Sequence, residues 1–247
     1  MSAVLVLRGV RKGFSRGGRE WVSVLEGVSF EVARGEVGAV VGARLSGKTT
    51  LLQLVAGVEL PDAGTIELAG CELTTLSRRR REHLLGEQLV WMDRYGPAQE
   101  SVKVWRFVGW PLASERGRRH AETRAVQMLE RVGAREYAGR CWGELSNWQR
   151  MLVGLARAFA GSPSVVVLDD LMDALGTPGA GEASDLLRSL MEEADPPCAV
   201  LMSASDPDSA LFADRVWSLR NGKLVLLAGH QTDDADIIPL RARDREG

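Results

Sequence analysis

The chain has 247 residues, of which 45% are hydrophobic and 26% are charged, and these are the proportions of an ordinary globular domain. Its formal net charge of −2 gives no overall basic character, which argues against a nucleic-acid partner. The three cysteines and three histidines are scattered along the sequence, which excludes a disulfide framework and a histidine-based metal site.

The N-terminal apolar run is the first feature along the chain. It is too short for the hydrophobic region of a secretory signal. No later stretch approaches the roughly eighteen apolar residues of a transmembrane helix. We therefore expect a cytoplasmic protein that reaches a membrane only through a partner.

The first part of the chain predicts several strands and one helix. Residues 4–7 and 22–32 carry apolar side chains at a period of two, as half-buried strands do. Residues 36–41 predict a short buried strand, residues 49–56 a helix and residues 65–68 another strand.

The pattern becomes helical and charged from residue 76 to about residue 140. A helix is then predicted after Ser146, a buried strand over residues 164–168, a helix over residues 180–193 and a strand over residues 199–202. Strands that alternate with helices indicate a parallel sheet covered on both faces. The helical middle indicates an insertion into that α/β core.

A phosphate-binding loop lies between the predicted strand at residues 36–41 and the helix at residues 49–56. The sequence there fits the P-loop pattern G-x-x-x-x-G-K-[ST], in which backbone N–H groups and a helix N-terminus surround the phosphates. We expect Lys48 to reach the β- and γ-phosphates and the Thr49 hydroxyl to bind Mg²⁺. The predicted nucleotide contacts in this loop are Gly42, Ala43, Arg44, Leu45, Ser46, Gly47, Lys48, Thr49 and Thr50.

Two further motifs follow in the second half of the chain. An apolar strand ends at Asp169, as in a Walker B segment, where the carboxylate holds Mg²⁺ through water. Upstream, Leu145, Ser146 and Gln149 fit an L-S-x-x-Q motif that opens a helix. Ser146 and Gln149 also have the spacing of a capping box, which predicts a helix N-terminus there.

These motifs, in this order, closely resemble those of the ATP-binding-cassette (ABC) ATPases over roughly residues 4–225. The resemblance implies a RecA-like P-loop core with an N-terminal antiparallel β subdomain and an inserted all-helical subdomain. The implied boundaries are residues 1–86 and 150–229 for the core, residues 87–149 for the helical subdomain and residues 230–247 for a polar tail.

The resemblance also implies ligands and partners. ATP and Mg²⁺ are the implied ligands, and Phe14 occupies the place of the aromatic residue that stacks on adenine, with a packed core phenylalanine as the alternative. Residues 72–78 and 139–145 most resemble the macrolide-exporter, lipoprotein-release and cell-division branch. The implied partners are a second ABC ATPase subunit and a transmembrane permease, which would hold the chain at the inner face of the cell membrane.

The residues that serve hydrolysis depart from the family pattern. In the signature Leu145, Ser146, Asn147, Trp148 and Gln149, two glycines are replaced, and an indole either obstructs the approach of a second subunit or packs against it. Asp170 stands where the family has a catalytic glutamate, and its shorter stem makes a poor general base.

Three more positions depart in the same way. Ser205 replaces the switch histidine, Met92 aligns with the Q-loop glutamine, and Gly176 replaces the aspartate that closes the D-loop. Gln88 is the alternative to Met92 if the alignment slips by four residues. Because the P-loop and Asp169 persist, the pattern indicates a selective loss of catalysis with retained binding.

The permease contact is expected within residues 93–111. Trp105, Phe107 and Trp110 either anchor that contact or fill the small core of the helical subdomain. The arginine run at residues 78–81 is better explained as a solvated helix face than as a nucleic-acid or lipid site.

Three functions remain open from the sequence. The first is a catalytically degenerate ABC subunit that pairs with a competent ATPase subunit and couples dimer closure to a permease. The second is an active homodimeric ABC ATPase with Asp170 as the general base. The third is an ATP-responsive scaffold without a transport role.

Overall fold

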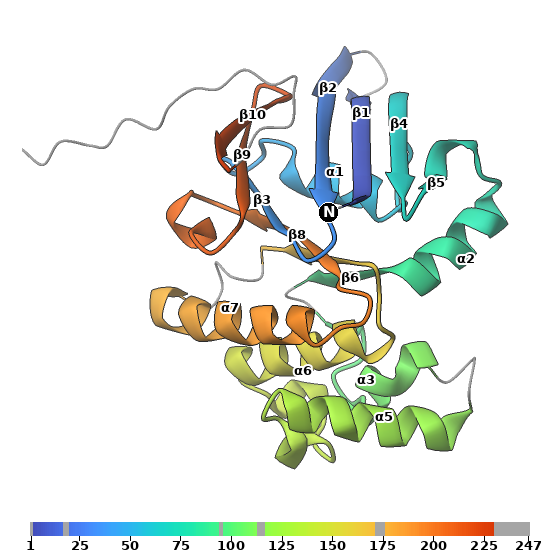
Figure 1. The fold of residues 1–247 in the computed structure, drawn as a ribbon, viewed down its shortest axis with the longest axis vertical. Coiled ribbons are helices and arrows are strands. Elements are labelled where there is room, and N and C mark those ends of the chain that lie inside the picture. Colours follow the sequence, from blue (N-terminus) through green and yellow to red (C-terminus); the bar gives the residue numbers. More distant parts are fainter. Residues whose placement is uncertain (1, 17–19, 94–95, 113–116, 171–175, 230–247) are drawn as a thin grey trace, which may run out of the picture.

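The computed structural model describes residues 2–16, 20–93, 96–112, 117–170 and 176–229 (Figure 1). The polar tail predicted for residues 230–247 lies outside the described residues. Within the described ranges, every helix is too short or too polar to span a lipid bilayer.

A six-stranded sheet lies at the centre of the fold in the order β10-β9-β3-β8-β7-β6. All neighbouring pairs except β9 and β10 are parallel. Its strands are β3 (Val37–Val41), β6 (Leu89–Asp93), β7 (Val165–Asp169), β8 (Ala199–Ala204), β9 (Arg215–Arg220) and β10 (Lys223–Ala228). Because β3, β8 and β7 are parallel neighbours, the loops that follow them meet at one edge of the sheet.

A second, antiparallel sheet lies above the first in Figure 1, in the order β2-β1-β4-β5. Its strands are β1 (Ala3–Arg16), β2 (Glu20–Ala33), β4 (Ala63–Leu68) and β5 (Cys71–Glu72). Helix α1 (Lys48–Val55) buries leucine and valine side chains in the core that the two sheets share. The predicted N-terminal antiparallel β subdomain is thereby confirmed.

The remaining helices are α2 (Arg78–Gln88), α3 (Val104–Gly109), α5 (Arg118–Arg131), α6 (Asn147–Ala160) and α7 (Gly176–Glu192). In Figure 1, α3, α5, α6 and α7 lie on the face of the six-stranded sheet opposite the antiparallel sheet. Helices α3, α5 and α6 pack on one another, and α6 also packs on α7 and on β6. They form the helical part of the molecule.

The side chains of β7 show how the central sheet divides the core. Val166 and Leu168 face the helical part, whereas Val165 and Val167 face α1 and the antiparallel sheet. All four are fully buried. A strand covered on both faces is a continuous apolar run rather than an alternating one, which explains the sequence before Asp169.

Strand β6 is not predicted by the sequence pattern. Residues 76–140 predict helices, yet Leu89–Asp93 forms an edge strand that pairs in parallel with β7. The central sheet therefore extends past the predicted core boundary at residue 86. The apolar run that forms this strand is short and directly follows a charged helix. It has too few residues for the spacing of its apolar side chains to distinguish a strand from a helix.

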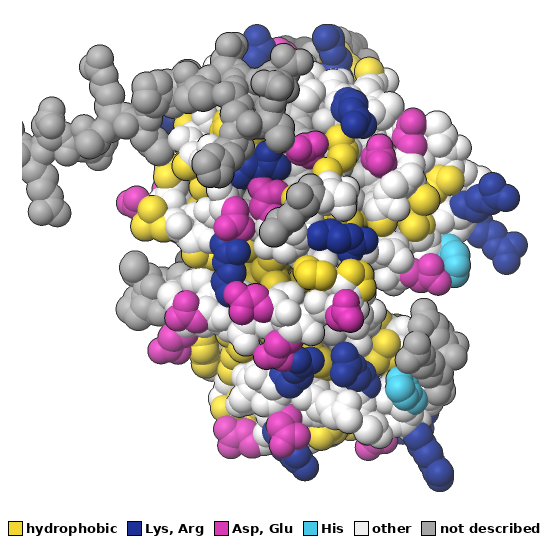
Figure 2. All heavy atoms as spheres, viewed as in Figure 1, with side chains coloured by type: hydrophobic (Ala, Val, Ile, Leu, Met, Phe, Trp, Pro, Cys, Tyr) yellow, Lys and Arg dark blue, Asp and Glu magenta, His cyan; other side chains and the backbone are white. Residues whose placement is uncertain are grey.

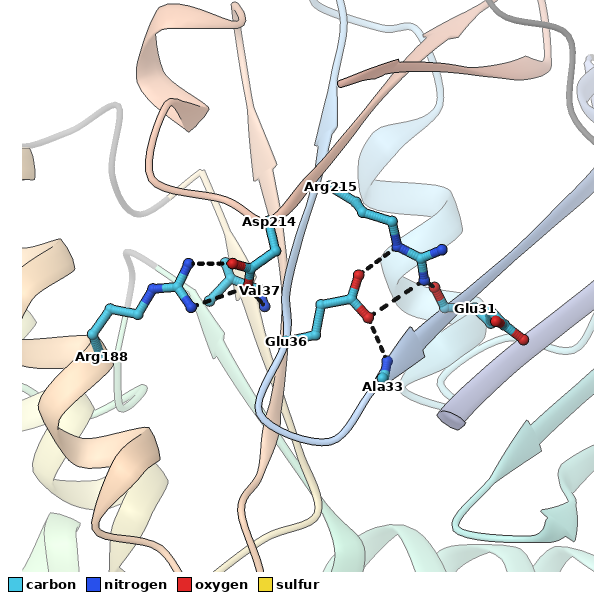
Figure 3. Close-up of polar contacts among 7 residues, drawn as sticks. All are labelled: Glu31, Ala33, Glu36, Val37, Arg188, Asp214 and Arg215. Atoms are coloured by element: carbon cyan, nitrogen blue, oxygen red, sulfur yellow. Dashed lines mark hydrogen bonds and ion pairs between the residues drawn. The ribbon is translucent and has the colours of Figure 1, made fainter. Parts of the chain in front are cut away.

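Two acidic residues fix the entry to β3 (Figure 3). Glu36 forms an ion pair with Arg215 in which the two side chains are only 14% and 11% exposed. Asp214 accepts the N–H of Val37 at 2.7 Å and a bidentate pair of bonds from Arg188 at 2.9 and 3.0 Å. These contacts tie β3 to β9 and α7, so the strand that leads into the P-loop is held at its start.

Candidate functional site

The ammonium group of Lys48 lies inside the P-loop that joins β3 to α1. The lysine is only 8% exposed. Its Nζ donates to the carbonyl oxygens of Gly42 at 2.7 Å and of Ala43 at 3.2 Å. A nearly buried cation needs polar partners, and a phosphate oxygen is a stronger counter-group than a carbonyl. The loop therefore holds a positive charge where a phosphate would bind.

The backbone of the loop is turned by residues with positive φ. Gly47 has a φ of 103° directly before α1, and a Cβ there would lie 2.9 Å from a methyl carbon of Val24. Leu45 also has a positive φ, of 66°, and its side chain is 97% exposed. The left-handed conformation costs a leucine about 1 kcal/mol. Positive-φ residues are typical of the loops in which successive N–H groups bind an anion.

The P-loop and the Walker B strand meet through two oxygen atoms. Thr49 Oγ1 at the start of α1 lies 3.4 Å from Asp169 Oδ1 at the end of β7. In the described part of the chain, no three His, Cys, Asp or Glu side chains gather around one point. Mg²⁺ binds oxygen, keeps several waters and needs only one or two protein ligands beside phosphate oxygens. The pair formed by Thr49 and Asp169 fits this ion.

Ser203 is a site residue that the sequence did not reveal. It is fully buried in β8, and its hydroxyl lies 2.8 Å from Asp169 Oδ1 and 3.3 Å from Asp170 Oδ1. The N–H of Asp170 donates to the same Oγ at 2.9 Å. Asp170 itself has a φ of 51°. The carboxyl ends of β7 and β8 are thus joined by one hydroxyl group, and Asp170 is turned toward β8.

A hollow of about 630 Å³ opens beside the P-loop. Ser205 lines it from the end of β8, and Ala43 and Arg44 line it from the P-loop. The structure therefore places Ser205, the predicted switch position, on the same hollow as the phosphate loop. The D-loop position, Gly176, begins α7, and residues 171–175 before it lie outside the described residues.

Phe14 lies on β1 and is 40% exposed. It belongs to neither of the two hydrophobic cores, so the alternative of a packed core phenylalanine does not hold. The Nζ of Lys12 lies 5.2 Å from the centre of its ring. An exposed aromatic face beside a cation is open to stacking by a nucleotide base.

The signature segment begins α6 as the sequence predicts. Ser146 Oγ accepts the N–H of Gln149 at 3.3 Å, and Gln149 Oε1 accepts the N–H of Ser146 at 2.9 Å, which confirms the capping box. Leu145 is buried and Asn147 is exposed. Trp148 is half-buried and packs against the helical core of its own chain. Part of the indole is therefore covered by its own chain, and only the remainder is open to a second subunit.

Met92 does not face the phosphate loop. It is buried where β6 packs on α6 and pairs with Leu168 of β7. Gln88 is no substitute, because its Oε1 accepts the hydroxyl of Ser164 at 2.6 Å at the opposite, amino end of β7. At about 3.3 Å per residue, the five-residue strand separates Gln88 from the phosphate edge. The alternative alignment that placed Gln88 in the Q-loop is wrong.

The three aromatic residues expected at a permease contact separate into two groups. Phe107 is buried and packs edge-on against Trp142, with 4.9 Å between the ring centres, so it fills the core of the helical part. Trp105 and Trp110 instead line a hollow of about 1180 Å³ between α2 and the helices α3 and α5. Trp110 is 71% exposed. Figure 2 shows a notch at the right-hand edge of the molecule, below the cationic side chains that cover α2.

Comparison with known proteins places the chain in one family. The family described as "ABC transporter" matches residues 25–173. The lipoprotein-releasing system ATP-binding protein LolD of Pseudomonas syringae pv. tomato is 34% identical over 224 residues, which are 90% of this chain and 97% of that protein. The methionine import ATP-binding protein MetN of Nocardia farcinica is 34% identical over 227 residues, which are 90% of this chain and 66% of the relative.

Solved structures show the same fold. A dimeric post-hydrolysis state of the ATP-binding cassette MJ0796, bound to ADP and Pi, has a TM-score of 0.79 at 22% identity and covers 89% of this chain and 96% of its own. CbiO1 of Clostridium perfringens, part of the transporter complex cbiONQ, has a TM-score of 0.80 at 24% identity, with 92% and 88% covered. The predicted resemblance and fold class are confirmed: the chain belongs to the ABC transporter family, as an ATP-binding subunit.

Proposed function

We propose that this chain binds ATP with Mg²⁺ but hydrolyses it weakly or not at all. In this proposal it is the degenerate partner of a competent ABC ATPase subunit. The observation that carries the proposal is the contact between Thr49 and Asp169, because it keeps the metal-binding half of the site assembled. The positions aligned with the family's catalytic glutamate and switch histidine hold Asp170 and Ser205 instead.

Weak hydrolysis follows from how these side chains lie. Asp170 has a shorter stem than glutamate, and its Oδ1 is 3.3 Å from the buried hydroxyl of Ser203. A displacement of about 1 Å in a catalytic group costs roughly a hundredfold in rate. Ser205 has no imidazole to bear a positive charge beside a γ-phosphate.

Pairing with a second subunit is supported by the signature segment. Ser146 Oγ accepts a bond from the N–H of Gln149, which leaves the hydroxyl proton of Ser146 to be donated. A phosphate of a partner's nucleotide is a suitable acceptor. Asn147 and Trp148, which replace the two glycines, restrict how closely the backbone can approach. A nucleotide site formed between this chain and a competent subunit would thus keep the Ser146 hydroxyl as a hydrogen-bond donor.

Coupling to a permease is assigned to the hollow between α2 and α3. Its rim carries the exposed indole of Trp110, and Trp105 lies on the same wall. Exposed tryptophans beside a concave surface are the residues that anchor helices in protein interfaces.

ATP that closes the dimer without being split would stabilise the closed form of the dimer. The size of this effect is set by the difference in ATP affinity between the open and the closed form.

The test compares the isolated chain with the mixed complex. The isolated chain is expected to bind Mg–ATP and to release phosphate at the background rate, whereas the complex of both subunits hydrolyses ATP. A Lys48→Ala variant serves as the control for binding in this loop. Robust turnover by the isolated chain that Lys48→Ala abolishes would overturn the proposal of weak hydrolysis.

A second candidate is an active homodimeric ATPase that uses Asp170 as its base. The retained carboxylate directly after Asp169 favours it. Loss of a measurable turnover in Asp170→Asn supports this candidate, and an unchanged rate removes its mechanism. An ATP-responsive scaffold without a transport role is excluded if a membrane protein copurifies with the chain.

A further inference from the structure

A serine hydroxyl lies at the centre of the two carboxylates that follow β7. Ser203 is fully buried and belongs to an otherwise apolar stretch of β8. Its Oγ is 2.8 Å from Asp169 Oδ1, 3.3 Å from Asp170 Oδ1 and 2.9 Å from the backbone N of Asp170. A buried hydroxyl with three polar neighbours from one segment is placed to hold that segment.

The donors and acceptors decide what each contact does. A serine hydroxyl carries one proton and two lone pairs. The N–H of Asp170 occupies one lone pair. The proton is donated to Asp169, because that oxygen is 0.5 Å nearer than the oxygen of Asp170, as 3.3 Å minus 2.8 Å gives. A bond to an ionised carboxylate is about twice as strong as a neutral one.

The backbone contact matters because Asp170 has a left-handed conformation. Its φ is 51°, a region that costs a residue with a side chain about 1 kcal/mol. The bond from the Asp170 N–H to Ser203 offsets part of that cost and fixes the turn directly after Asp169. One hydroxyl thus sets the direction of the Asp169 carboxylate and the path of the chain behind it.

We propose that Ser203 is a positioning residue for Mg²⁺, which holds the Asp169 carboxylate beside Thr49 in the orientation that the ion requires. This inference rests on the proposed binding of Mg–ATP at the P-loop. Thr49 Oγ1 and Ser203 Oγ approach the same atom, Asp169 Oδ1, at 3.4 and 2.8 Å. Removing the Ser203 hydroxyl takes away the 2.8 Å bond to Asp169 and the acceptor of the Asp170 N–H.

The test measures how strongly Mg²⁺ promotes nucleotide binding, with ADP as the probe so that hydrolysis plays no part. ADP is titrated calorimetrically at a series of Mg²⁺ concentrations. The titrations give the Mg²⁺ concentration at which the increase in ADP affinity is half-maximal. Ser203→Ala is expected to raise this concentration about tenfold, since a hydrogen bond to a charged group is lost. The affinity for ADP in excess EDTA stays as in the unmodified chain.

Two further variants separate the hydrogen bond from packing. Ser203→Cys keeps a similar shape with a weak donor and is expected to shift the Mg²⁺ requirement as Ser203→Ala does. Ser164→Ala removes another buried serine hydroxyl, which bonds to Gln88 at the far end of the sheet, and is expected to leave the Mg²⁺ requirement unchanged. Ser203→Cys also provides a folded variant if the alanine change prevents folding.

The outcomes are distinct. An unchanged Mg²⁺ requirement in Ser203→Ala and Ser203→Cys, or an equal shift in Ser164→Ala, overturns the role of Ser203 while the proposed function stands. Failure of the unmodified chain to bind ADP with Mg²⁺ overturns the proposed function and this inference together.

Discussion

The terminal methyl group of Met92 fills the space beside the backbone of Gly154. A Cβ at Gly154 would lie 2.1 Å from Met92 Cε and 3.0 Å from its sulfur. The contact joins β6 to α6. Met92 is therefore part of the hydrophobic core, and its terminal methyl group takes the space that a Cβ at residue 154 would need.

Gly154→Ala is expected to raise the free energy of unfolding by less than Gly86→Ala does, because the gain in helix propensity is partly offset by the shift of the Met92 methyl group that the new Cβ requires. Gly86→Ala in α2 is the matched control, since an added Cβ there meets nothing within 4 Å. It is expected to raise the free energy of unfolding by about 0.5–1 kcal/mol. Urea unfolding measures both. If Gly154→Ala gains no more stability in a Met92→Ala background than in the unmodified chain, the two residues are not in the proposed contact.

Glu36→Gln is expected to lower the free energy of unfolding by about 3 kcal/mol, since it leaves Arg215 without its charged partner in a mostly buried place. Thermal or urea unfolding measures the loss. The control is Glu82→Gln, which removes the exposed ion pair with Arg78 and should leave stability unchanged. Equal losses of stability from the two changes would contradict the claim that the ion pair of Glu36 and Arg215 stabilises the fold at the start of β3.

Asp170→Glu and Ser205→His together are expected to raise phosphate release by at least about tenfold over the unmodified chain, and more than either change alone. The longer stem brings a carboxylate toward the phosphates, and the imidazole restores a cation at the switch position. Steady-state phosphate release measures this. Adding Lys48→Ala must abolish the gain, and a gain that survives it comes from another site or a contaminant.

Phe107→Ala is expected to cost about 3–5 kcal/mol of stability, because the ring packs in the helical core against Trp142. Trp110→Ala should leave stability nearly unchanged and weaken association with the permease, because its indole is exposed on the rim of the hollow. Chemical unfolding and copurification with the permease separate the two effects. Full permease binding by Trp110→Ala would remove this residue from the contact.

Burial raises the pKa of the Cys198 thiol to about 12, so the thiolate is suppressed in the folded protein. The unfolded chain releases this proton at lower pH, so stability is complete below about pH 8.5 and declines as pH rises toward 12. At pH 8, iodoacetamide should modify the exposed Cys71 and spare Cys198 until urea unfolds the chain. Peptide mass spectrometry measures this, and equal modification of both thiols in the native protein would contradict the burial of Cys198.

Much of the fold could be predicted because its signals are local. The P-loop is a contiguous motif, and the capping box of Ser146 and Gln149 spans four residues, so neither depends on distant contacts. The apolar run before Asp169 indicates a strand buried on both faces, and β7 is such a strand.

The remaining features depend on how distant segments pair. Ser203 meets Asp169 and Asp170 only because β8 lies beside β7 in a particular register, and a serine in an apolar strand carries no mark of that register. Strand β6 is short and follows a charged helix, so its period was ambiguous. Phe107 and Trp110 are aromatic residues only three positions apart, so the sequence does not show which of them is buried. Only the packing of the helices makes Phe107 a core residue and leaves Trp110 exposed.

Calorimetric titration of the isolated chain with a non-hydrolysable ATP analogue, with and without Mg²⁺, tests the central claim most directly. The predicted result is saturable binding that strengthens with Mg²⁺ and is lost in Lys48→Ala, because the loop and the pair formed by Thr49 and Asp169 hold the phosphates and the ion. Absence of any Mg²⁺-dependent binding in the unmodified chain, alone or with its partner subunits, would contradict that claim.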